Sequence, residues 1–278
     1  VRLSGRGRVT RRVGLPGAAD QAFEQRPADL SHPDVNHAPV AYLYGVVAHP
    51  GREPLALVQP ARLEADVYAI AAERRAEGGE IMSWDTRPIT RTSVQAYIET
   101  ALSAAGVTSS LEVETRDDIE TTNIIGEIPG ASPSQVLITG HYDAFYEGAD
   151  DNTSAVAVML EAARVFAGST PALTLRIVFF DHEEAYHLGS QRYVDAHRSD
   201  DIALVINMDS VGFASSERNS QKSIHGVPAP DVGDFIVLVA NEASEIPATR
   251  MAGLAPVLSS PIKLRALIVP KESAYPAL

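Results

Sequence analysis

Histidine and carboxylate side chains follow directly after three apolar runs of the sequence. The segments that carry them are 140–143 (GHYD), 181–184 (DHEE) and Asp209. Ligands of open α/β sheets bind at the carboxyl ends of the strands, so these side chains are expected at one common rim. Crowded carboxylates raise one another's pKa unless a cation neutralises them. One histidine with several carboxylates and no cysteine is a ligand set that suits Zn²⁺, Mn²⁺ or Co²⁺.

The spacing within these segments indicates different roles for neighbouring side chains. His141 and Asp143 are two residues apart at a strand end and can face the same way, so Asp143 can orient a metal-bound His141. The adjacent Glu183 and Glu184 point in two directions, which leaves one carboxylate for a metal and the other as a general base. A further polar segment, 148–154 (GADDNTS), opens a predicted helix. Hydrolases with two metal ions commonly share carboxylates between the ions.

Alternating helices and strands must position these residues. The apolar run QVLIT is typical of a strand covered on both faces, and the run after GADDN is apolar nearly all round, as in a buried helix. Helices are predicted at 63–76, 92–105, 153–167 and 190–198, and strands at 111–114, 123–128, 135–139, 173–180 and 203–208. Beyond these, the pattern predicts a helix at 231–244 and a last strand at 264–269. This order indicates an α/β domain with a mostly parallel central β-sheet.

The composition excludes several classes of protein. The chain has 278 residues with 23 Lys+Arg against 36 Asp+Glu, a net charge of −13, which argues against nucleic acid or another polyanion as a partner. No apolar stretch approaches the roughly 18 residues needed to span a bilayer, so no membrane span is predicted. The absence of cysteine removes disulfides, thiolate catalysis and cysteine-based zinc fingers.

Residues 1–62 are predicted to be a variable N-terminal extension. They mix arginine-rich and proline-containing segments, and only 40–47 has the pattern of a strand. The arginines of the first twelve residues are interpreted as a solvated tail rather than as a nucleic-acid-binding arm. Regular helix and strand signals begin near residue 63, so 63–278 is predicted to be the catalytic domain.

Four segments, in this order, resemble the metal-site motifs of the co-catalytic di-zinc exopeptidases of clan MH. They are GHYD at 140–143, GADDNTS at 148–154, FFDHEEAYHLGS at 179–190 and INMDSVG at 206–212. That group includes bacterial secreted leucine-type aminopeptidases, glutamate carboxypeptidases and, more distantly, glutaminyl cyclases. The resemblance runs from about residue 63 to 213, more loosely to 278, and leaves out the first 60 residues. It implies the zinc-exopeptidase, phosphorylase/hydrolase-like fold, with helices on both faces of the sheet.

The resemblance also implies a role for each residue of the cluster. The metal ligands would be His141, Asp151, Glu184 and Asp209, and the catalytic residues Glu183 and Asp143. Asp151 would bridge two Zn²⁺ ions, His141 and Asp209 would bind one ion, and Glu184 would bind the other. Glu183 would be the general base for a hydroxide that lies between the ions and attacks a peptide carbonyl, while Asp143 supports His141. The substrate would be a peptide or an amino-acid derivative.

The sequence departs from this family at its last metal ligand. Family members carry a final metal-binding histidine after a late strand, whereas no histidine follows the predicted strand 264–269. His225 lies before the predicted helix 231–244, on the wrong side of it. We therefore expect the chain to end just short of that ligand, which leaves the second metal with Asp151 and Glu184.

Several neighbouring side chains have a simpler interpretation. Asp150 is interpreted as an acid favoured at a helix N-terminus rather than as a ligand, because Asp151 aligns better. His182 and His187 flank the glutamate pair, and surface or packed histidines are favoured over pocket-lining ones. Three aromatic side chains near the site can either line a pocket for the substrate side chain or simply pack in the core, namely Tyr142, Phe145 and Tyr146.

The favoured function is a metal-dependent exopeptidase, most simply an aminopeptidase. One alternative is a glutaminyl cyclase, an acyltransferase with one zinc, against which GADDN and INMDSVG argue because they indicate two metals. Another is a non-catalytic binding homologue, which has no need of a base such as Glu183. The ten-residue step from His141 to Asp151 favours clan MH over a second di-zinc exopeptidase group with an H-x-D…D…EE pattern.

The sequence leaves open the side-chain preference, amino- against carboxypeptidase action, the native metal and the oligomeric state. A secreted or periplasmic location follows from the resemblance, although no signal peptide is visible.

Overall fold

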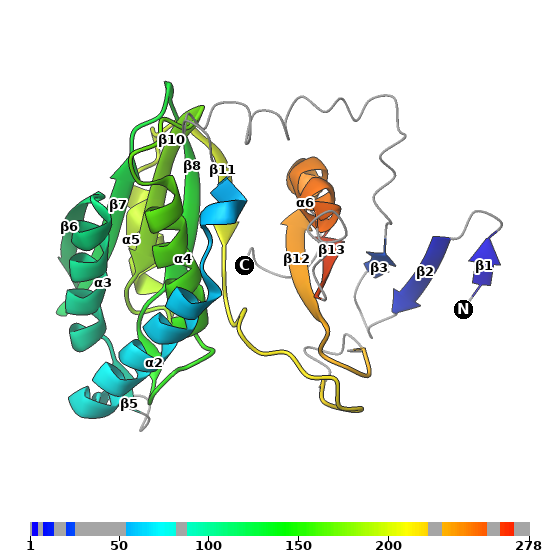
Figure 1. Cartoon of the computed structure of the whole chain (residues 1–278), viewed down its shortest axis with the longest axis horizontal. Coiled ribbons are helices and arrows are strands. Elements are labelled where there is room, and N and C mark those ends of the chain that lie inside the picture. Colours follow the sequence, from blue (N-terminus) through cyan, green and yellow to red (C-terminus); the bar gives the residue numbers. More distant parts are fainter. Residues whose placement is uncertain are drawn as a thin grey trace. The chain divides into compact units, whose positions relative to one another are not determined.

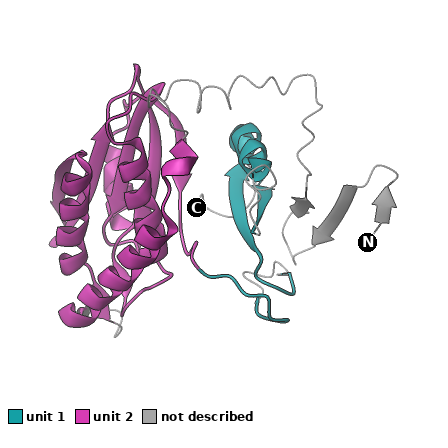
Figure 2. Ribbon diagram, viewed as in Figure 1, with its two compact units in different colours: residues 1–36, 213–278 teal, residues 37–212 magenta. Residues whose placement is uncertain are grey.

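The structure, a computed structural model, describes residues 54–81, 88–221, 230–254 and 262–269, together with the backbone of three short strands at 2–4, 8–13 and 21–25. The chain divides into two compact units, His37–Gly212 and a second unit made of Val1–Asn36 with Phe213–Leu278 (Figure 2). Within the described part of the chain, no helix combines the length and the apolar character needed to cross a membrane. The predicted strand at 40–47 lies outside the described residues. The proposed boundary between residues 62 and 63 stays a prediction.

A five-stranded sheet forms the centre of the unit His37–Gly212, in the order β11-β8-β10-β7-β6 (Figure 1). The strands are β6 Thr108–Arg116, β7 Ile119–Ile128, β8 Ser132–His141, β10 Leu173–Phe180 and β11 Ile202–Asn207. β8 pairs in parallel with both β10 and β11, whereas β7 pairs antiparallel with both β10 and β6. The α/β class is confirmed, and the sheet is mixed rather than purely parallel, because β7 runs opposite to the other four strands.

A two-residue turn explains the antiparallel half of the sheet. Asp117 and Asp118 join β6 to β7 with φ angles of 53° and 62°. Two left-handed residues in succession match the type I′ turn of a tight hairpin, and aspartate tolerates this conformation better than most residues. Parallel neighbours need a long crossover instead, such as the helices that follow β8 and β10.

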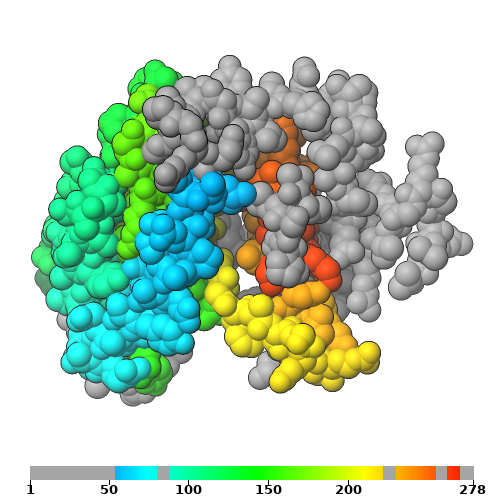
Figure 3. Space-filling model, viewed as in Figure 1, coloured from blue at the N-terminus to red at the C-terminus, as the bar shows by residue number. Residues whose placement is uncertain are grey.

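Helices cover both faces of this sheet, as predicted. The described helices of the unit are η1 Pro54–Leu57, α2 Pro60–Glu77, α3 Thr92–Ala105, α4 Thr153–Phe166 and α5 Leu188–Ala196. α2, α3 and α4 pack together on one face, and α2 lies over the outer surface with little of α4 visible (Figure 3). α5 covers the other face, where Tyr193 packs on Leu137 and Val178. The predicted helices at 63–76, 92–105, 153–167 and 190–198 are therefore confirmed, with small shifts of their ends.

Three further short strands form a small antiparallel sheet in the order β4-β5-β9. They are β4 Glu80–Ile81, β5 Pro88–Thr90 and β9 Ala144–Phe145. β9 follows β8 after two residues, and its partner β5 ends two residues before α3 begins. This small sheet therefore links the carboxyl end of β8 to the segment between α2 and α3.

The second unit contains a parallel strand pair with one helix between the strands. β12 Phe235–Asn241 pairs with β13 Lys263–Val269, and η2 Glu242–Ser244 and α6 Glu245–Ala252 follow β12. The predicted last strand at 264–269 is confirmed. The predicted helix at 231–244 is wrong, because the run FIVLVAN is a strand with branched and aromatic residues that favour a pleated surface.

The amino-terminal segment also contains strands that the sequence pattern did not predict. β1 Arg2–Ser4, β2 Arg8–Val13 and β3 Gln21–Gln25 form an antiparallel sheet in that order. The backbone forms ladder pairs from β1 to β2 and from β2 to β3. The interpretation of the arginines in this part of the chain as a solvated tail stays a prediction.

An ion pair between α2 and α4 provides a test of how the helical face is held together. Arg164 donates hydrogen bonds of 2.6 and 3.0 Å to Asp66, which is 3% exposed and also accepts the hydroxyl of Tyr97 at 2.8 Å. We expect Arg164→Ala to lower the free energy of unfolding by roughly 3 kcal/mol, because it leaves a buried carboxylate without its cation. Urea unfolding followed by circular dichroism measures this loss.

A matched control comes from an exposed pair on α2. Arg75 forms two hydrogen bonds with Glu147, at 2.7 and 2.8 Å, but both side chains are more than half exposed. Arg75→Ala should leave the unfolding midpoint close to that of the wild type, since solvent screens exposed ion pairs. Equal losses for the two variants would contradict the assigned role of burial.

Candidate metal centre

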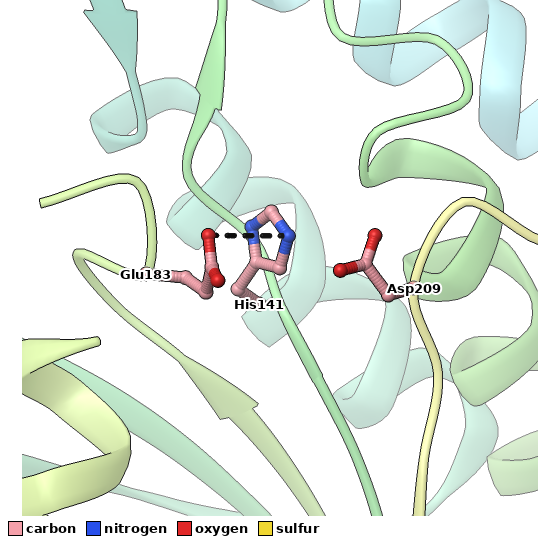
Figure 4. Close-up of side chains that lie close together, drawn as sticks. All are labelled: His141, Glu183 and Asp209. Atoms are coloured by element: carbon pink, nitrogen blue, oxygen red, sulfur yellow. Dashed lines mark ion pairs between the residues drawn. The ribbon is translucent and has the colours of Figure 1, made fainter. Parts of the chain in front are cut away.

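The end of β8 carries the residue at the centre of the predicted site. His141 is the last residue of β8, which lies between β10 and β11 in the sheet. Glu183 follows the end of β10, and Asp209 follows the end of β11. One ligand atom from each of these three side chains lies within 4.8 Å of the others, and Glu183 and Asp209 approach the imidazole from opposite sides (Figure 4). The expectation that strand ends bring these residues together therefore holds for this trio.

The two imidazole nitrogens of His141 have different surroundings. Nδ1 lies 2.9 Å from the carbonyl oxygen of Asp143. A carbonyl only accepts, so Nδ1 carries a proton and Nε2 is free to bind a metal when the ring is neutral. Nε2 lies 3.2 Å from an oxygen of Asp151 and 3.8 Å from an oxygen of Glu183. Nε2 is nonetheless buried without a hydrogen-bond partner among the described residues.

The raised pKa values of the cluster show that a positive charge is favoured beside Nε2 of His141. Burial favours a lower pKa for His141, but the carboxylates of Asp143, Asp151 and Glu183 outweigh it and raise the pKa to about 11. Burial raises the pKa of Glu184 to about 7, with a further contribution from Asp151. Burial also raises the pKa of Glu183. A divalent cation satisfies the same carboxylates without these protons, so the donor set fits a zinc ion.

Asp143 connects His141 to the backbone of both glutamates. The side chain is fully buried, and its two oxygens accept the backbone N–H groups of Glu183 at 3.0 Å and Glu184 at 3.1 Å. One of these oxygens lies 3.6 Å from Nδ1 of His141. Asp143 therefore supports His141 through its carbonyl oxygen, while its carboxylate fixes the backbone of both glutamates. This second contact joins the ends of β8 and β10.

The remaining predicted ligands lie around this trio with unequal exposure. The Asp151 side chain is 56% exposed and precedes α4. Asp209 is exposed, and one of its oxygens accepts the hydroxyl of Ser210 at 2.9 Å. Glu184 is half-buried and lies outside the trio of close ligand atoms. Its role as a ligand of a second ion stays a prediction.

A set of hydrogen bonds ties the start of α4 to the segment after β11. The side chain of Asn152 donates to the carbonyl of Met208 at 3.0 Å and accepts the N–H of Ser210 at 3.2 Å. Asp150 accepts the N–H of Gly212 at 2.7 Å. This hydrogen bond positions the segment after β11. These contacts place Asp151 and Asp209 at one edge. The peptide bond between Asp151 and Asn152 is cis.

Arg74 is a buried residue near the site that the sequence reasoning missed. It is 1% exposed and donates to the carbonyl of Tyr142 at 2.6 Å and the carbonyl of Thr90 at 2.8 Å. It also donates to the hydroxyl of Thr153 at 3.1 Å. Arg74 thus joins α2, β5, the β8 end and the start of α4. No local pattern distinguishes it from the other arginines of α2, since its partners lie up to 79 residues away.

Some of the aromatic and histidine side chains near the predicted site are buried, and others are exposed. Tyr142 is fully buried, and its hydroxyl donates to the carbonyl of Thr122 at 2.9 Å, so it packs in the core rather than lines a pocket for the substrate side chain. Tyr146 is 57% exposed, and the short strand β9 contains Phe145. His182 is buried, whereas His187 is exposed and lies 2.7 Å from Glu183. His225 and residues 270–278 lie outside the described residues.

Comparison with known proteins identifies the segment that holds the site. Residues 123–245 match peptidase family M28. The matched segment is just under half of the chain. The M28 segment contains all six predicted site residues, and the resemblance to the di-zinc exopeptidases is confirmed at the level of this family.

Two curated relatives are similar to less than half of this chain. Leupeptin-inactivating enzyme 1 of Streptomyces exfoliatus is 35% identical over 124 residues, which are 42% of this chain and 28% of that protein. A probable leucine aminopeptidase of Trichophyton verrucosum is 29% identical over 142 residues, 45% of this chain and 39% of that protein. The chain therefore spans well under half the length of these relatives.

Solved structures share the fold at low sequence identity. A leucine aminopeptidase precursor from Bacteroides thetaiotaomicron has a TM-score of 0.52 at 18% identity, and the likeness covers 77% of this chain and 79% of that one. The glutaminyl cyclase of the same organism has a TM-score of 0.51 at 18% identity, over 74% of this chain and 76% of that one. A leucine aminopeptidase precursor and a glutaminyl cyclase therefore both share this fold, and the fold does not distinguish the two reactions.

Proposed function

We propose that this protein is a zinc-dependent aminopeptidase that hydrolyses the first peptide bond of its substrates. The observation that carries the proposal is the buried Nε2 of His141, which faces the carboxylates of Asp151 and Glu183 without a hydrogen-bond partner among the described residues. A buried nitrogen in that position is costly unless a metal ion binds it. The M28 match and the aminopeptidase names of the relatives support the same reaction.

Two zinc ions are proposed for the complete site. His141, Asp151, Glu184 and Asp209 would hold them, and their donor atoms are the nitrogen and carboxylate oxygens that zinc accepts in hydrolases. Bound zinc supplies a water of lowered pKa and polarises the scissile carbonyl. The half-exposed Asp151 and the exposed Asp209 leave the outer side of the site open to a substrate.

Glu183 is proposed as the general base. Its side chain is 28% exposed, and one of its oxygens lies 3.8 Å from Nε2 of His141, so it borders the place where a substrate carbonyl would lie. Burial raises the pKa of this carboxyl toward the range of an effective base. Glu183 would take a proton from the attacking water and deliver it to the departing amine. Asp143 holds the backbone of Glu183 in place for this transfer.

A peptide with a free amino terminus is the proposed substrate. The site is rich in carboxylates, and the whole chain has a net charge of −13, so a cationic α-amino group is attracted to this edge of the sheet. Glutaminyl cyclisation is the competing reaction, because glutaminyl cyclases share the fold. A secreted or periplasmic location is proposed from the family resemblance alone.

Hydrolysis of leucine p-nitroanilide by the intact protein tests the proposal. We expect activity that o-phenanthroline abolishes and that added zinc restores, because the reaction depends on metal bound by His141 and the carboxylates. An N-acetylated anilide serves as the control and should not be cleaved. Activity that survives complete chelation contradicts the proposal. Cyclisation of a peptide with N-terminal glutamine, without anilide hydrolysis, assigns the protein to the competing reaction.

A further inference from the structure

His187 contacts the carboxylate that is proposed as the general base. Its Nδ1 lies 2.7 Å from Oε1 of Glu183, which is four residues earlier in the chain. The sequence favoured a surface or packed histidine at this position, and the His187 side chain is 62% exposed.

The contact divides the two oxygens of Glu183 between different partners. His187 binds Oε1, whereas Oε2 points to the site and lies 3.8 Å from Nε2 of His141. A glutamate side chain has three rotatable bonds, and a bond to one oxygen limits where the other oxygen lies. The oxygen that would receive a proton is therefore held toward the metal centre.

His187 is itself fixed by the turn that leads into α5. Its φ of 58° is left-handed, a conformation uncommon for residues other than glycine and several-fold enriched for histidine and asparagine. Its N–H donates to the carbonyl of Glu183 at 2.9 Å, and its carbonyl accepts the N–H of Gln191 at 3.1 Å. The next residue, Leu188, donates to the carbonyl of His182 at 3.0 Å. The imidazole thus projects from a hydrogen-bonded turn rather than from a loose loop.

We propose that His187 is a positioning residue for Glu183, which it holds in the orientation that accepts a proton in the reaction. This inference rests on the proposed function and adds a residue to it. It predicts an effect on turnover and none on zinc binding, because His187 contacts the base and is absent from the set of close ligand atoms.

The competing explanation is an ordinary surface ion pair. The side chain of His187 is 62% exposed, and exposed ion pairs contribute little to stability. A second histidine offers a matched comparison, since Nε2 of His197 lies 2.7 Å from Glu112. That pair belongs to a network with Asp200 and Tyr193 around α5, and none of its members is a predicted site residue. A purely structural role predicts the same turnover for variants at His187 and His197.

Three variants of the intact protein separate these explanations: His187→Ala, His187→Asn and His197→Ala. Asparagine retains an N–H donor near the position of Nδ1 and tolerates the left-handed backbone. For each variant, kcat and KM are measured with leucine p-nitroanilide, zinc affinity by calorimetric titration, and stability by thermal melting. For His187→Ala we expect kcat to fall on the order of 10-fold, as when other residues that orient a catalytic group are removed. KM, zinc affinity and the melting temperature should stay near wild type.

The three variants distinguish a positioning role of His187 from an ordinary surface ion pair. Recovery of kcat in His187→Asn, with wild-type kcat in His197→Ala, supports the contact with Glu183 as the cause. Wild-type kcat in His187→Ala overturns the inference while the proposed function stands. A folded His187→Asn as slow as His187→Ala overturns it as well, and so does a parallel loss of zinc in His187→Ala. A wild-type protein without metal-dependent hydrolysis overturns the proposed function and this inference with it.

Discussion

Glu183→Gln is expected to lower kcat by roughly 10²–10⁴-fold, the range that a general base contributes. Glutamine keeps the size of the side chain and loses the ability to accept the proton of the attacking water. Its backbone N–H still reaches Asp143, so the turn after β10 should keep its shape. The variant should therefore bind zinc with near wild-type affinity and unfold at the wild-type temperature.

Glu184→Gln is the matched comparison, because it makes the same chemical change one residue later. We expect this variant to weaken zinc binding and to regain part of its activity at high zinc concentration. Steady-state kinetics and calorimetric zinc titration of both variants measure the difference. Wild-type turnover in Glu183→Gln contradicts the assigned mechanism. Loss of zinc in Glu183→Gln instead makes this residue a ligand, an arrangement that its closeness to His141 and Asp209 would permit.

His141→Ala is expected to abolish both zinc binding and hydrolysis. His141 offers the nitrogen donor of the site, and its Nε2 is the buried atom that faces Asp151 and Glu183. Removal of an outer hydrogen-bond partner of a metal ligand costs roughly 10–100-fold in affinity, and removal of the ligand itself should exceed that loss. Calorimetric zinc titration of the intact protein measures the change.

The His141→Ala result needs a control for folding, since the substitution also leaves the buried Asp143 without its neighbour. Circular dichroism and thermal melting show whether the sheet is retained, and His197→Ala removes a histidine that contacts Glu112 and Asp200 instead of the metal site. Undiminished zinc binding by a folded His141→Ala variant would place the metal elsewhere. That outcome would contradict the site described here.

The central part of the fold was predictable because each element has a strong local signal. The apolar runs before His141, Asp181 and the Asp209 segment are strands β8, β10 and β11, and the apolar run after Asn152 is α4. The placement of His141 at a strand end follows from these runs alone. Side chains after parallel neighbouring strands must meet at one edge, which explains why the main ligand cluster was also predictable.

Other parts of the fold depend on competing local preferences. The run 235–241 is mostly apolar and contains the branched residues Ile236, Val237 and Val239, and it forms a strand where the pattern predicted a helix. Short apolar runs fit either element by periodicity alone, and branched residues tip the balance toward a strand. The turn at Asp117 and Asp118 likewise decides that β6 and β7 are antiparallel.

The supporting residues of the site were not predictable because their partners are distant in the chain. Arg74 contacts Thr153, and Asn152 contacts Met208, across 79 and 56 residues. Polar side chains of these types are common on helices and loops, so only the folded arrangement reveals that they hold the site together. The ion pair of His187 with Glu183 spans four residues, yet it depends on the left-handed backbone of His187 directly before α5.

Anomalous diffraction at the zinc edge, from crystals of the intact protein grown with zinc, tests the central claim most directly. We expect a zinc peak about 2.0–2.1 Å from Nε2 of His141. We also expect a second peak roughly 3.5–4 Å from the first, with Asp151 between the two ions. Zinc peaks confined to surface carboxylates, with none beside Nε2 of His141, would contradict the account.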